Sequence, residues 1–222
     1  MISIDSLRFE YEKESFQLSI SKLSIVKKHK TAIIGPSGSG KTTILKLISG
    51  ILIPNEGNIS VATTHVNQLT DAQRRAFRIK SIGFIFQDFQ LINYLNILDN
   101  IIHPFRITSS LKLTKEVSAR AIELAHKLNI DNKLFDKPEK LSQGEKQRVA
   151  ICRALLPKPK LILADEATGN LDPENKTRIL DYLFECIEEQ NATLVAVTHD
   201  HELLPKFDYV INFLEFYHAN KT

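Results

Sequence analysis

The stretch that decides the fold is Thr31-Ala32-Ile33-Ile34, followed by Gly35-Pro36-Ser37-Gly38-Ser39-Gly40-Lys41-Thr42-Thr43. The first four residues predict a buried strand, and residues 43–48 predict a helix. The loop between them fits G-x-x-x-x-G-K-[ST] in the strand–loop–helix setting that this pattern requires. Its backbone N–H groups can approach phosphates closely, and the helix N-terminus faces negative charge. Residues 35–43 are therefore expected to bind a nucleotide phosphate.

Two side chains of this loop are expected to have separate roles. Lys41 carries a mobile positive charge that can reach the β- and γ-phosphates, and Thr42 offers a hydroxyl to Mg²⁺. The alternative is a glycine-rich turn with a solvated lysine, which the flanking strand and helix disfavour. Alone, the loop predicts a P-loop nucleotide-binding protein, a class that also contains small-molecule kinases and GTPases.

Strands and helices alternate along the chain. Apolar residues separated by polar ones predict half-buried strands near the N-terminus, and continuous apolar runs predict buried strands further on. The expected strands are those of residues 2–11, 16–20, 31–34, 81–87, 161–164 and 193–197. Because strands that alternate with helices form parallel sheets, we expect an α/β protein with a P-loop NTPase core of the RecA-like type.

The helical pattern suggests an insertion into this core. A capping box, Thr70-Asp71-Ala72-Gln73, opens a short basic helix that is expected to run to Arg78. Helical spacing then predominates from residue 88 to residue 159. We expect a single domain of 222 residues with two lobes. Residues 1–87 and 160–222 form the nucleotide-binding lobe, and residues 88–159 form the inserted helical lobe.

Composition narrows the class of protein. The net charge of +3 comes from a small, scattered excess of basic residues, which gives little support to a nucleic-acid or anionic-lipid partner. Cys152 and Cys186 lack CxxC spacing and are expected to be reduced thiols. The N-terminus does not resemble a signal peptide, and no apolar run approaches the roughly 18 residues of a membrane span. If the protein acts at a membrane, another chain is expected to supply the membrane part.

Two carboxylates follow the buried strand of residues 161–164. Asp165 and Glu166 lie at its carboxyl end, which in a parallel sheet faces the phosphate loop. Asp165 is therefore expected to hold Mg²⁺, directly or through water, and Glu166 to polarise the attacking water as a general base. The alternative, an ordinary acidic strand exit, is disfavoured by the phosphate loop upstream.

Leu141-Ser142-Gln143-Gly144-Glu145 closely resembles the signature of the ATP-binding cassette (ABC) family, usually written LSGGQ or LSGGE. By itself this could be only a helix start, because Ser142 and Glu145 form a capping box. The order of the motifs favours the family: phosphate loop, Gln87, signature, acidic pair, residues 169–172 and Thr198-His199-Asp200. The chain is identified as a member of this family, which implies an N-terminal antiparallel β subdomain and an inserted α-helical subdomain around the P-loop core.

The resemblance implies roles for further residues. Tyr11 stacks on adenine, an interaction worth about 1–3 kcal/mol, although packing against Phe9 on the same strand face is the alternative. Gln87 contacts Mg²⁺ and the water and senses the permease, unless it is only a polar strand end. His199 holds the γ-phosphate and orients the water. Asp172 lies at the subunit interface.

The signature implies a shared site. Ser142 and Gly144 contact the γ-phosphate of the ATP that a second copy of the chain binds, because a helix N-terminus suits a terminal phosphate. Gln143 and Glu145 belong to the same binding site. ATP therefore controls formation of a homodimer. Gln143 stands where the family usually has a second glycine, and it adds a side chain near that phosphate.

The resemblance covers essentially the whole chain and implies an ATPase that drives a separate permease from the cytoplasmic face of the inner membrane. Residues 82–87 and 168–172 are most similar to the ATPases of lipoprotein-release, macrolide-export and cell-division systems. Residues 210–216 lack the glycine-containing hairpin that is usual there. Permeases of this class insert a short helix beside the segment of residues 88–98, so some of its apolar residues are expected to line a groove; the alternative is that they pack the helical lobe.

Two other functions were weighed. An ABC-type ATPase acting in DNA repair or translation is disfavoured, because such relatives carry long coiled coils, zinc modules or two cassettes. A small-molecule kinase would need neither the signature nor the element at His199. We therefore expect ATP and Mg²⁺ as cofactors, a second copy and a permease as partners, and no nucleic acid.

Overall fold

Two sheets and a set of helices make up the computed structural model, which describes residues 1–11, 16–167 and 173–216. The antiparallel sheet has the order β2-β1-β4-β5. Its strands are β1 (Ile2–Glu10), β2 (Gln17–Ile25), β4 (Glu56–Val61) and β5 (Thr64–His65). This sheet is the N-terminal antiparallel subdomain that the family resemblance implied.

The second sheet is parallel throughout, with the order β6-β7-β8-β3-β9. Its strands are β3 (Lys30–Ile34), β6 (Ile82–Ile85), β7 (Leu161–Asp165), β8 (Thr193–Val197) and β9 (Tyr209–Asn212). The six α-helices in the described part of the chain are α1 (Lys41–Ile48), α2 (Asp71–Ser81), α3 (Ile97–Arg106), α4 (Lys115–Lys127), α5 (Gln143–Leu155) and α6 (Pro173–Glu189). Short 3₁₀ helices span Val66–Gln68, Asp131–Lys133, Pro138–Lys140, His201–Lys206 and Phe213–Phe216.

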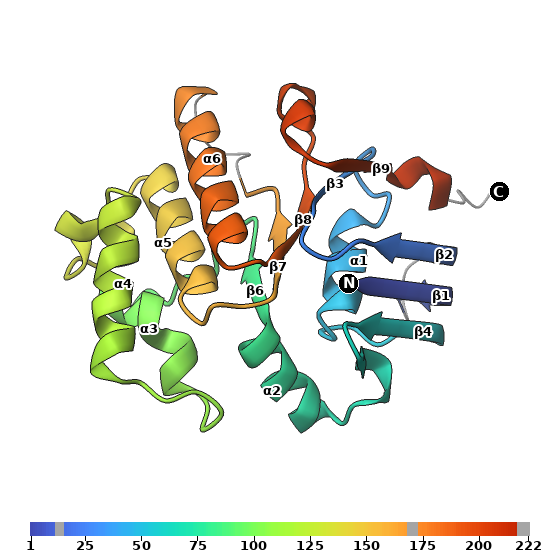
Figure 1. Ribbon diagram of the computed structural model, residues 1–222, viewed down its shortest axis with the longest axis horizontal. Helices are drawn as coiled ribbons and strands as arrows, with labels where there is room; N and C mark the ends of the chain where they lie inside the picture. The colour runs from blue at the N-terminus through green and yellow to red at the C-terminus, as the bar shows by residue number, and fades with distance from the viewer. Residues whose placement is uncertain (12–15, 168–172, 217–222) are drawn as a thin grey trace.

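The parallel sheet separates two buried cores. Leu161 and Leu163 of β7 face α1 and the antiparallel sheet. Their neighbours Ile162 and Ala164 face the helices α3 to α6. Side chains alternate between the two faces of a strand, so both faces of β7 are buried, as its continuous apolar run predicted. Figure 1 shows this arrangement, with the antiparallel sheet on one side of the parallel sheet and the helical part on the other.

Several element boundaries differ from the sequence prediction by a few residues. The capping box of Thr70 and Gln73 is confirmed, but α2 continues to Ser81, and its last turn contains Arg78 and Lys80, whose positive charges suit a helix C-terminus. Helix α6 begins at Pro173, and residue 172 before it lies outside the described residues.

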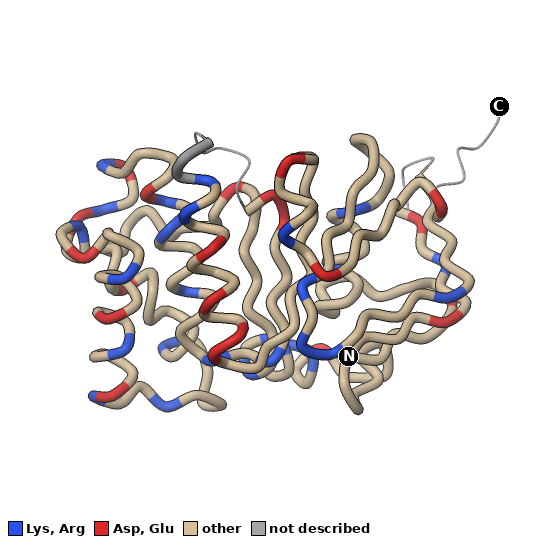
Figure 2. Tube along the Cα trace, turned by 45° about the horizontal axis from the view of Figure 1, so that its top comes forward, with Lys and Arg blue, Asp and Glu red and all other residues tan. Residues whose placement is uncertain are grey.

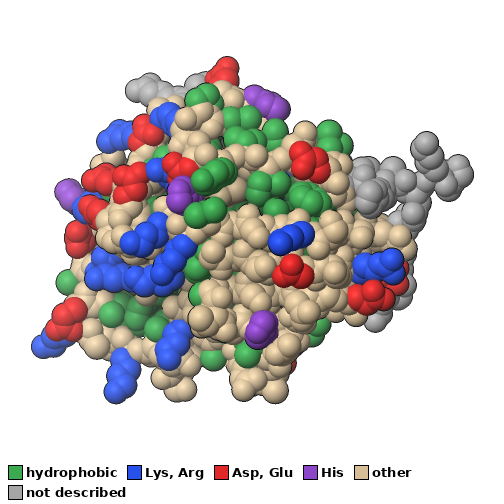
Figure 3. Space-filling view, turned by 45° about the vertical axis from the view of Figure 1, so that its right-hand side comes forward, with side chains coloured by type: hydrophobic (Ala, Val, Ile, Leu, Met, Phe, Trp, Pro, Cys, Tyr) green, Lys and Arg blue, Asp and Glu red, His purple; other side chains and the backbone are tan. Residues whose placement is uncertain are grey.

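The C-terminal segment adds an edge strand to the parallel sheet. Strand β9 pairs with β3, with Tyr209 opposite Thr31. Tyr209, Val210 and Leu214 are each about half exposed. In Figure 3, hydrophobic side chains gather on the upper part of the face that is turned forward. Charged residues of both signs are interspersed along the described trace (Figure 2), as the small net charge suggested.

The segment between β6 and α3 is not helical, contrary to the helical run expected from residue 88. Phe89 and Gln90 have φ of 61° and 48°, in the left-handed region that interrupts a helix. Arg153 of α5 donates hydrogen bonds to both of their carbonyls. The two carbonyls therefore accept hydrogen bonds from Arg153 in place of the backbone N–H groups of a helix. The regular helix begins only at Ile97.

Asn100 fixes the second half of this segment from inside the core. It is 0% exposed. Its Nδ2 donates to the carbonyls of Ile92, Leu95 and Asn96 at 3.1, 3.3 and 3.0 Å, and its Oδ1 accepts from the N–H of Ile92 at 2.7 Å. One side chain therefore satisfies four backbone groups of residues 92–96.

Replacing Asn100 with alanine is expected to lower the free energy of unfolding by about 2–3 kcal/mol, because buried backbone groups lose their partners. Urea unfolding of the purified protein measures the change. Asn93→Ala is the matched control, because Asn93 is exposed and its side chain makes no hydrogen bond in the described residues. We expect a control effect below about 0.5 kcal/mol, and equal losses in both variants would contradict the assigned role.

Candidate functional site

The carboxyl ends of four parallel strands carry the predicted site residues to one edge of the sheet. The phosphate loop follows β3, Gln87 lies just beyond β6, Glu166 follows β7, and His199 lies just beyond β8. Their side chains line one cavity of about 640 Å³. Its lining consists of Tyr11, Phe16, Gly35, Ser37, Gly38, Gly40, Lys41, Thr42, Thr43, Gln87, Glu166, Val197 and His199. Residues that are far apart in sequence thus form a single concave site.

The phosphate loop has the backbone that close approach to an anion requires. Gly40 caps α1 with φ of 96°, and it makes no side-chain cap, so the first N–H groups of the helix remain available. A Cβ on Gly40 would lie 2.8 Å from the ring of Phe16. The positive φ and the close ring of Phe16 both require glycine at this position.

Lys41 provides the positive charge of this loop. Its Nζ donates to the carbonyls of Gly35 and Pro36 at 2.8 and 2.7 Å. Burial lowers the pKa of Lys41, while the negative charges of Glu166 and Asp165 oppose that shift. The ammonium is therefore held over the loop, within reach of a phosphate bound there.

Thr42 and Asp165 form an oxygen pair suited to a hard cation. Thr42 Oγ1 donates to Asp165 Oδ1 at 3.2 Å, and Asp165 is 4% exposed. Burial raises the pKa of Asp165, and nearby Glu166 raises it further, against the hydrogen bond from Thr42. A bound cation would offset the free-energy cost of burying the charged carboxylate of Asp165. Mg²⁺ needs few protein ligands when phosphates supply the others, so these residues fit Mg²⁺ held together with a nucleotide.

Glu166 lies between Gln87, which donates to it, and His199. Gln87 Nε2 donates to Glu166 Oε2 at 3.1 Å, and His199 Nδ1 lies 3.4 Å from Glu166 Oε1. The backbone of Glu166 has φ of 50°, a strained region for a residue other than glycine, and its N–H donates to the carbonyl of Val197 at 3.1 Å. The strained backbone directs the carboxylate into the cavity, where it can accept a proton from a water molecule.

Tyr11 packs against neighbouring rings and also lines the cavity. Its ring meets the edge of Phe9 at 4.8 Å and lies 5.9 Å from Phe16, and its hydroxyl lies 3.2 Å from Thr43 Oγ1. Both alternatives weighed for Tyr11 are therefore compatible with its position. In the sequence, Phe16 shows only the periodicity of a strand over residues 16–20. Its place in the cavity depends on contact with Gly40, for which strand periodicity gives no signal.

The signature residues are not brought to this cavity. Ser142 caps α5: its Oγ accepts from the N–H of Glu145 at 3.3 Å, and Glu145 Oε2 accepts from the N–H of Ser142 at 2.8 Å. None of residues 142–145 lines the cavity of the phosphate loop. Gln143 lines a separate cavity, together with Gln87 and Asp88. Asp172 lies outside the described residues.

Comparison with known proteins shows similarity to one family throughout. The model of the family described as "ABC transporter" matches residues 18–169. The chain is 38% identical, over 95% of its length, to the macrolide export ATP-binding/permease protein MacB of Rhodopirellula baltica, but it spans only 31% of that protein. It is 39% identical, over 81% of its length, to the lipoprotein-releasing system ATP-binding protein LolD of Hydrogenovibrio crunogenus, and it spans 77% of that protein.

A solved structure shares the whole fold. It is the dimeric, post-hydrolysis state of the ATP-binding cassette MJ0796 bound to ADP and Pi, with a TM-score of 0.87 and 32% sequence identity. The match covers 96% of this chain and 94% of that one. With the phosphate loop and the carboxylates at one sheet edge, these similarities leave one assignment: the chain belongs to the ABC transporter family and is one of its ATPase subunits.

Proposed function

We propose that this ATPase works as a homodimer and drives a separate membrane permease, as an ATPase similar to LolD and to the ATP-binding part of MacB. The observation that carries the proposal is the position of Glu166, held between Gln87 and His199 at the edge where the phosphate loop opens. A carboxylate in this position can activate water for attack on a γ-phosphate.

The other side chains of the cavity bind and orient the nucleotide in this proposal. Lys41 and the N-terminus of α1 hold the phosphates, Tyr11 contacts the base, and His199 positions the water beside the γ-phosphate. Thr42, Asp165 and Gln87 would hold Mg²⁺, which supplies charge neutralisation at the phosphates when it is bound.

Dimerisation completes each site in the proposal. Ser142 to Glu145 begin a capped helix outside the cavity, so a second copy is needed to present this helix N-terminus to the γ-phosphate. The dimeric state of the similar cassette MJ0796 supports this arrangement. Asp172 is proposed to lie at the same interface.

Glu166→Gln tests the assigned general base. The amide keeps the size of the side chain but cannot accept a proton, so hydrolysis should slow by about 10²–10⁴-fold while ATP binding stays intact. ATPase assays and nucleotide titration measure the two effects. Glu139→Gln, an exposed carboxylate outside the cavity, is the control. A Glu166→Gln variant with the wild-type rate would show that another group activates the water.

A second cavity, of about 330 Å³, is proposed to receive the permease. This cavity, called the groove below, is lined by Ile51, Arg78, Ile79, Ile82, Gly83, Phe84, Phe86, Gln90, Ile92, His103, Pro104, Ile107, Arg153, Ala154 and Pro157. Most of these residues are apolar, and Ile107 is 57% exposed. Exposed apolar grooves tend to bind partners, and a helix can lie in such a groove.

The groove adjoins the active site through the residues around Gln87. Phe86 and Gln90, on either side of Gln87 in sequence, both line it. Of the segment of residues 88–98, only Gln90 and Ile92 reach the groove. Leu91 and Leu98 pack against the core of the helical part. For these two residues the alternative applies, in which apolar residues of the segment pack the helical lobe. Tyr94 is 79% exposed and lies outside the groove lining.

Membrane attachment is proposed to depend on the permease partner. Residues 1–11, 16–167 and 173–216 include no helix long and apolar enough to cross a membrane. We propose that the protein binds at the cytoplasmic face of the inner membrane, through its permease.

Ile107→Asp tests docking in the groove. A charge on this half-exposed apolar side chain should leave folding and ATP binding unchanged, and it should abolish copurification with a membrane permease, because burying the charge is costly. The measurement is a pull-down from solubilised membranes, with thermal unfolding as the check on folding. Phe135→Asp is the control, since Phe135 is 83% exposed and lies outside the groove. Normal copurification of Ile107→Asp would place the docking surface elsewhere.

A further inference from the structure

The groove has an unbalanced set of charges. Its lining contains three basic side chains, Arg78, His103 and Arg153, and no aspartate or glutamate. They come from three different helices, α2, α3 and α5, that surround the apolar lining. Two guanidinium groups and one imidazole therefore face the groove from several sides, and its lining contains no carboxylate.

Backbone carbonyls are the only described partners of the two guanidinium groups. Arg78 Nη1 donates to the carbonyl of Gly50 at 2.8 Å, and Arg153 Nη1 donates to that of Gln90 at 2.6 Å. A guanidinium has five N–H donors, so each keeps capacity for an additional acceptor. Neither forms an ion pair with a carboxylate in the part of the chain that the structure describes.

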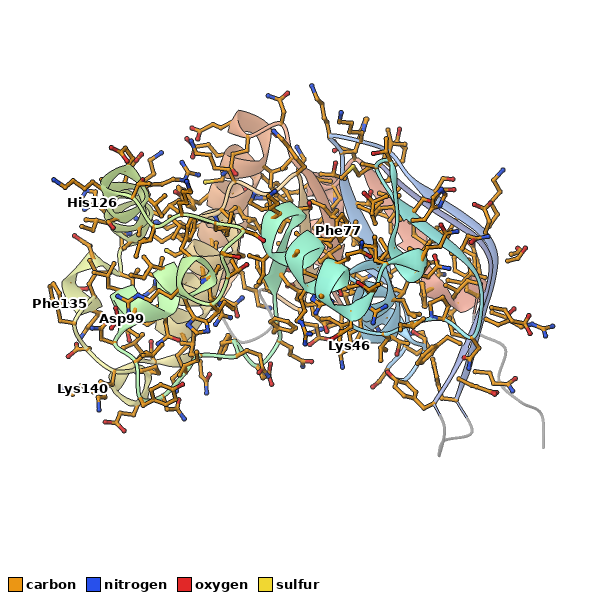
Figure 4. The ribbon with its side chains drawn as sticks, turned by 90° about the horizontal axis from the view of Figure 1, so that it is seen from below. Lys46, Phe77, Asp99, His126, Phe135 and Lys140 are labelled. Atoms are coloured by element: carbon orange, nitrogen blue, oxygen red, sulfur yellow. The ribbon has the colours of Figure 1, made fainter. Side chains whose placement is uncertain are left out.

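The acidic residues of the neighbouring helices are paired outside the groove. Asp71 pairs with Arg74 and Arg75, and Asp99 pairs with Arg106. In Figure 4, which shows α2 and α3 from below, the labelled Asp99 lies toward the end of α3 that is remote from α2. These carboxylates form no ion pair with the basic groups of the groove, although the charge of Asp71 still raises the pKa of Arg78.

The positive charges also disfavour one another. Burial lowers the pKa of His103, and the charges of Arg153 and Arg106 lower it further. Burial lowers the pKa of Arg153 to about 10, with Asp88 opposing the shift. Burial and the charge of Arg74 likewise lower the pKa of Arg78. A negative charge in the groove would relieve all three groups at once.

We infer that the permease segment seated in the groove is a helix with an acidic side chain between apolar ones, and that Arg78, His103 and Arg153 receive this acid. The inference rests on the proposed docking of the permease and adds the chemistry of the partner. A concave apolar groove suits the apolar face of a helix. A basic segment is excluded, because like charges brought together at an interface are strongly unfavourable.

The same contact reaches the hydrolysis site. Arg153 donates to the carbonyls of Phe89 and Gln90, which belong to the same turn as Gln87. Gln87 in turn donates to Glu166. A carboxylate bound to Arg153 would therefore contact the side chain that holds the turn of Gln87, and Gln87 is one of the two residues beside Glu166.

The test begins by identifying the permease segment in the groove. A photo-crosslinking residue in place of Ile79 is used in the complex purified from membranes, and the crosslinked permease peptide is sequenced. We expect an aspartate or glutamate within one helical turn of the crosslinked residue. A crosslinked segment without a carboxylate there overturns the inference.

Charge exchange then tests the contact itself. Arg78→Glu should weaken copurification with the permease about thirtyfold, as expected when one partner of a buried charge pair is lost. Replacing the identified permease acid with arginine should do the same, and combining the two changes should restore binding. Arg75→Glu is the matched control, since Arg75 lies on the same helix outside the groove and its side chain is 63% exposed.

A second variant covers the possibility that Arg78→Glu disturbs the fold through Gly50. Arg78→Gln keeps a donor for that carbonyl, removes the charge, and should still weaken copurification. Failure of the exchange to restore binding, or unchanged binding of Arg78→Gln, overturns the inference while leaving the proposed function intact. If no permease copurifies with the wild-type protein, the proposed function and the inference both fail.

Discussion

The parallel pairing of β3, β6, β7 and β8 is the constraint on which the rest of the structure depends. Because all four strands run in one direction, the segments after their carboxyl ends meet at one edge. The phosphate loop, Gln87, Glu166 and His199 follow these four strands and line one cavity. Burial of both sheet faces fixes the strands that hold these residues, and the left-handed backbone of Glu166 turns its carboxylate inward.

The turn that contains Gln87 also joins the cavity to the groove, because hydrogen bonds link it to residues of both. Gln87 donates to Glu166 on one side, and the residues that follow Gln87 are held by Arg153 on the other. Phe89 and Gln90 adopt left-handed backbone conformations there, so this turn depends on Arg153 rather than on regular secondary structure. Since Arg153 belongs to α5, the helix that begins at the signature, one rigid element touches the groove and carries the residues proposed to meet the second copy.

The sequence predicted the parts of the site that depend on local pattern. The phosphate loop, the carboxylates after β7 and His199 follow strands whose apolar runs are visible in the sequence, and all of them reach the expected edge. Other features depend on contacts between distant elements. Phe16 enters the cavity by meeting Gly40, and residues 88–96 leave the helical pattern because Arg153 and Asn100 bind their carbonyls. The charges of the groove come from three separate helices, which no spacing rule connects.

In the proposed dimer, one copy supplies the phosphate loop and the carboxylates of each site, and a second copy supplies the signature. The most direct test is ATPase activity of two tandem fusions that carry the same two lesions, Lys41→Ala and Ser142→Arg. In the first fusion the lesions are in different copies, so a shared arrangement leaves one site intact and predicts measurable activity. In the second both lesions are in one copy, so a shared arrangement damages both sites and predicts no activity. An inactive first fusion and an active second one would contradict the account, because they would show that each copy forms its site alone.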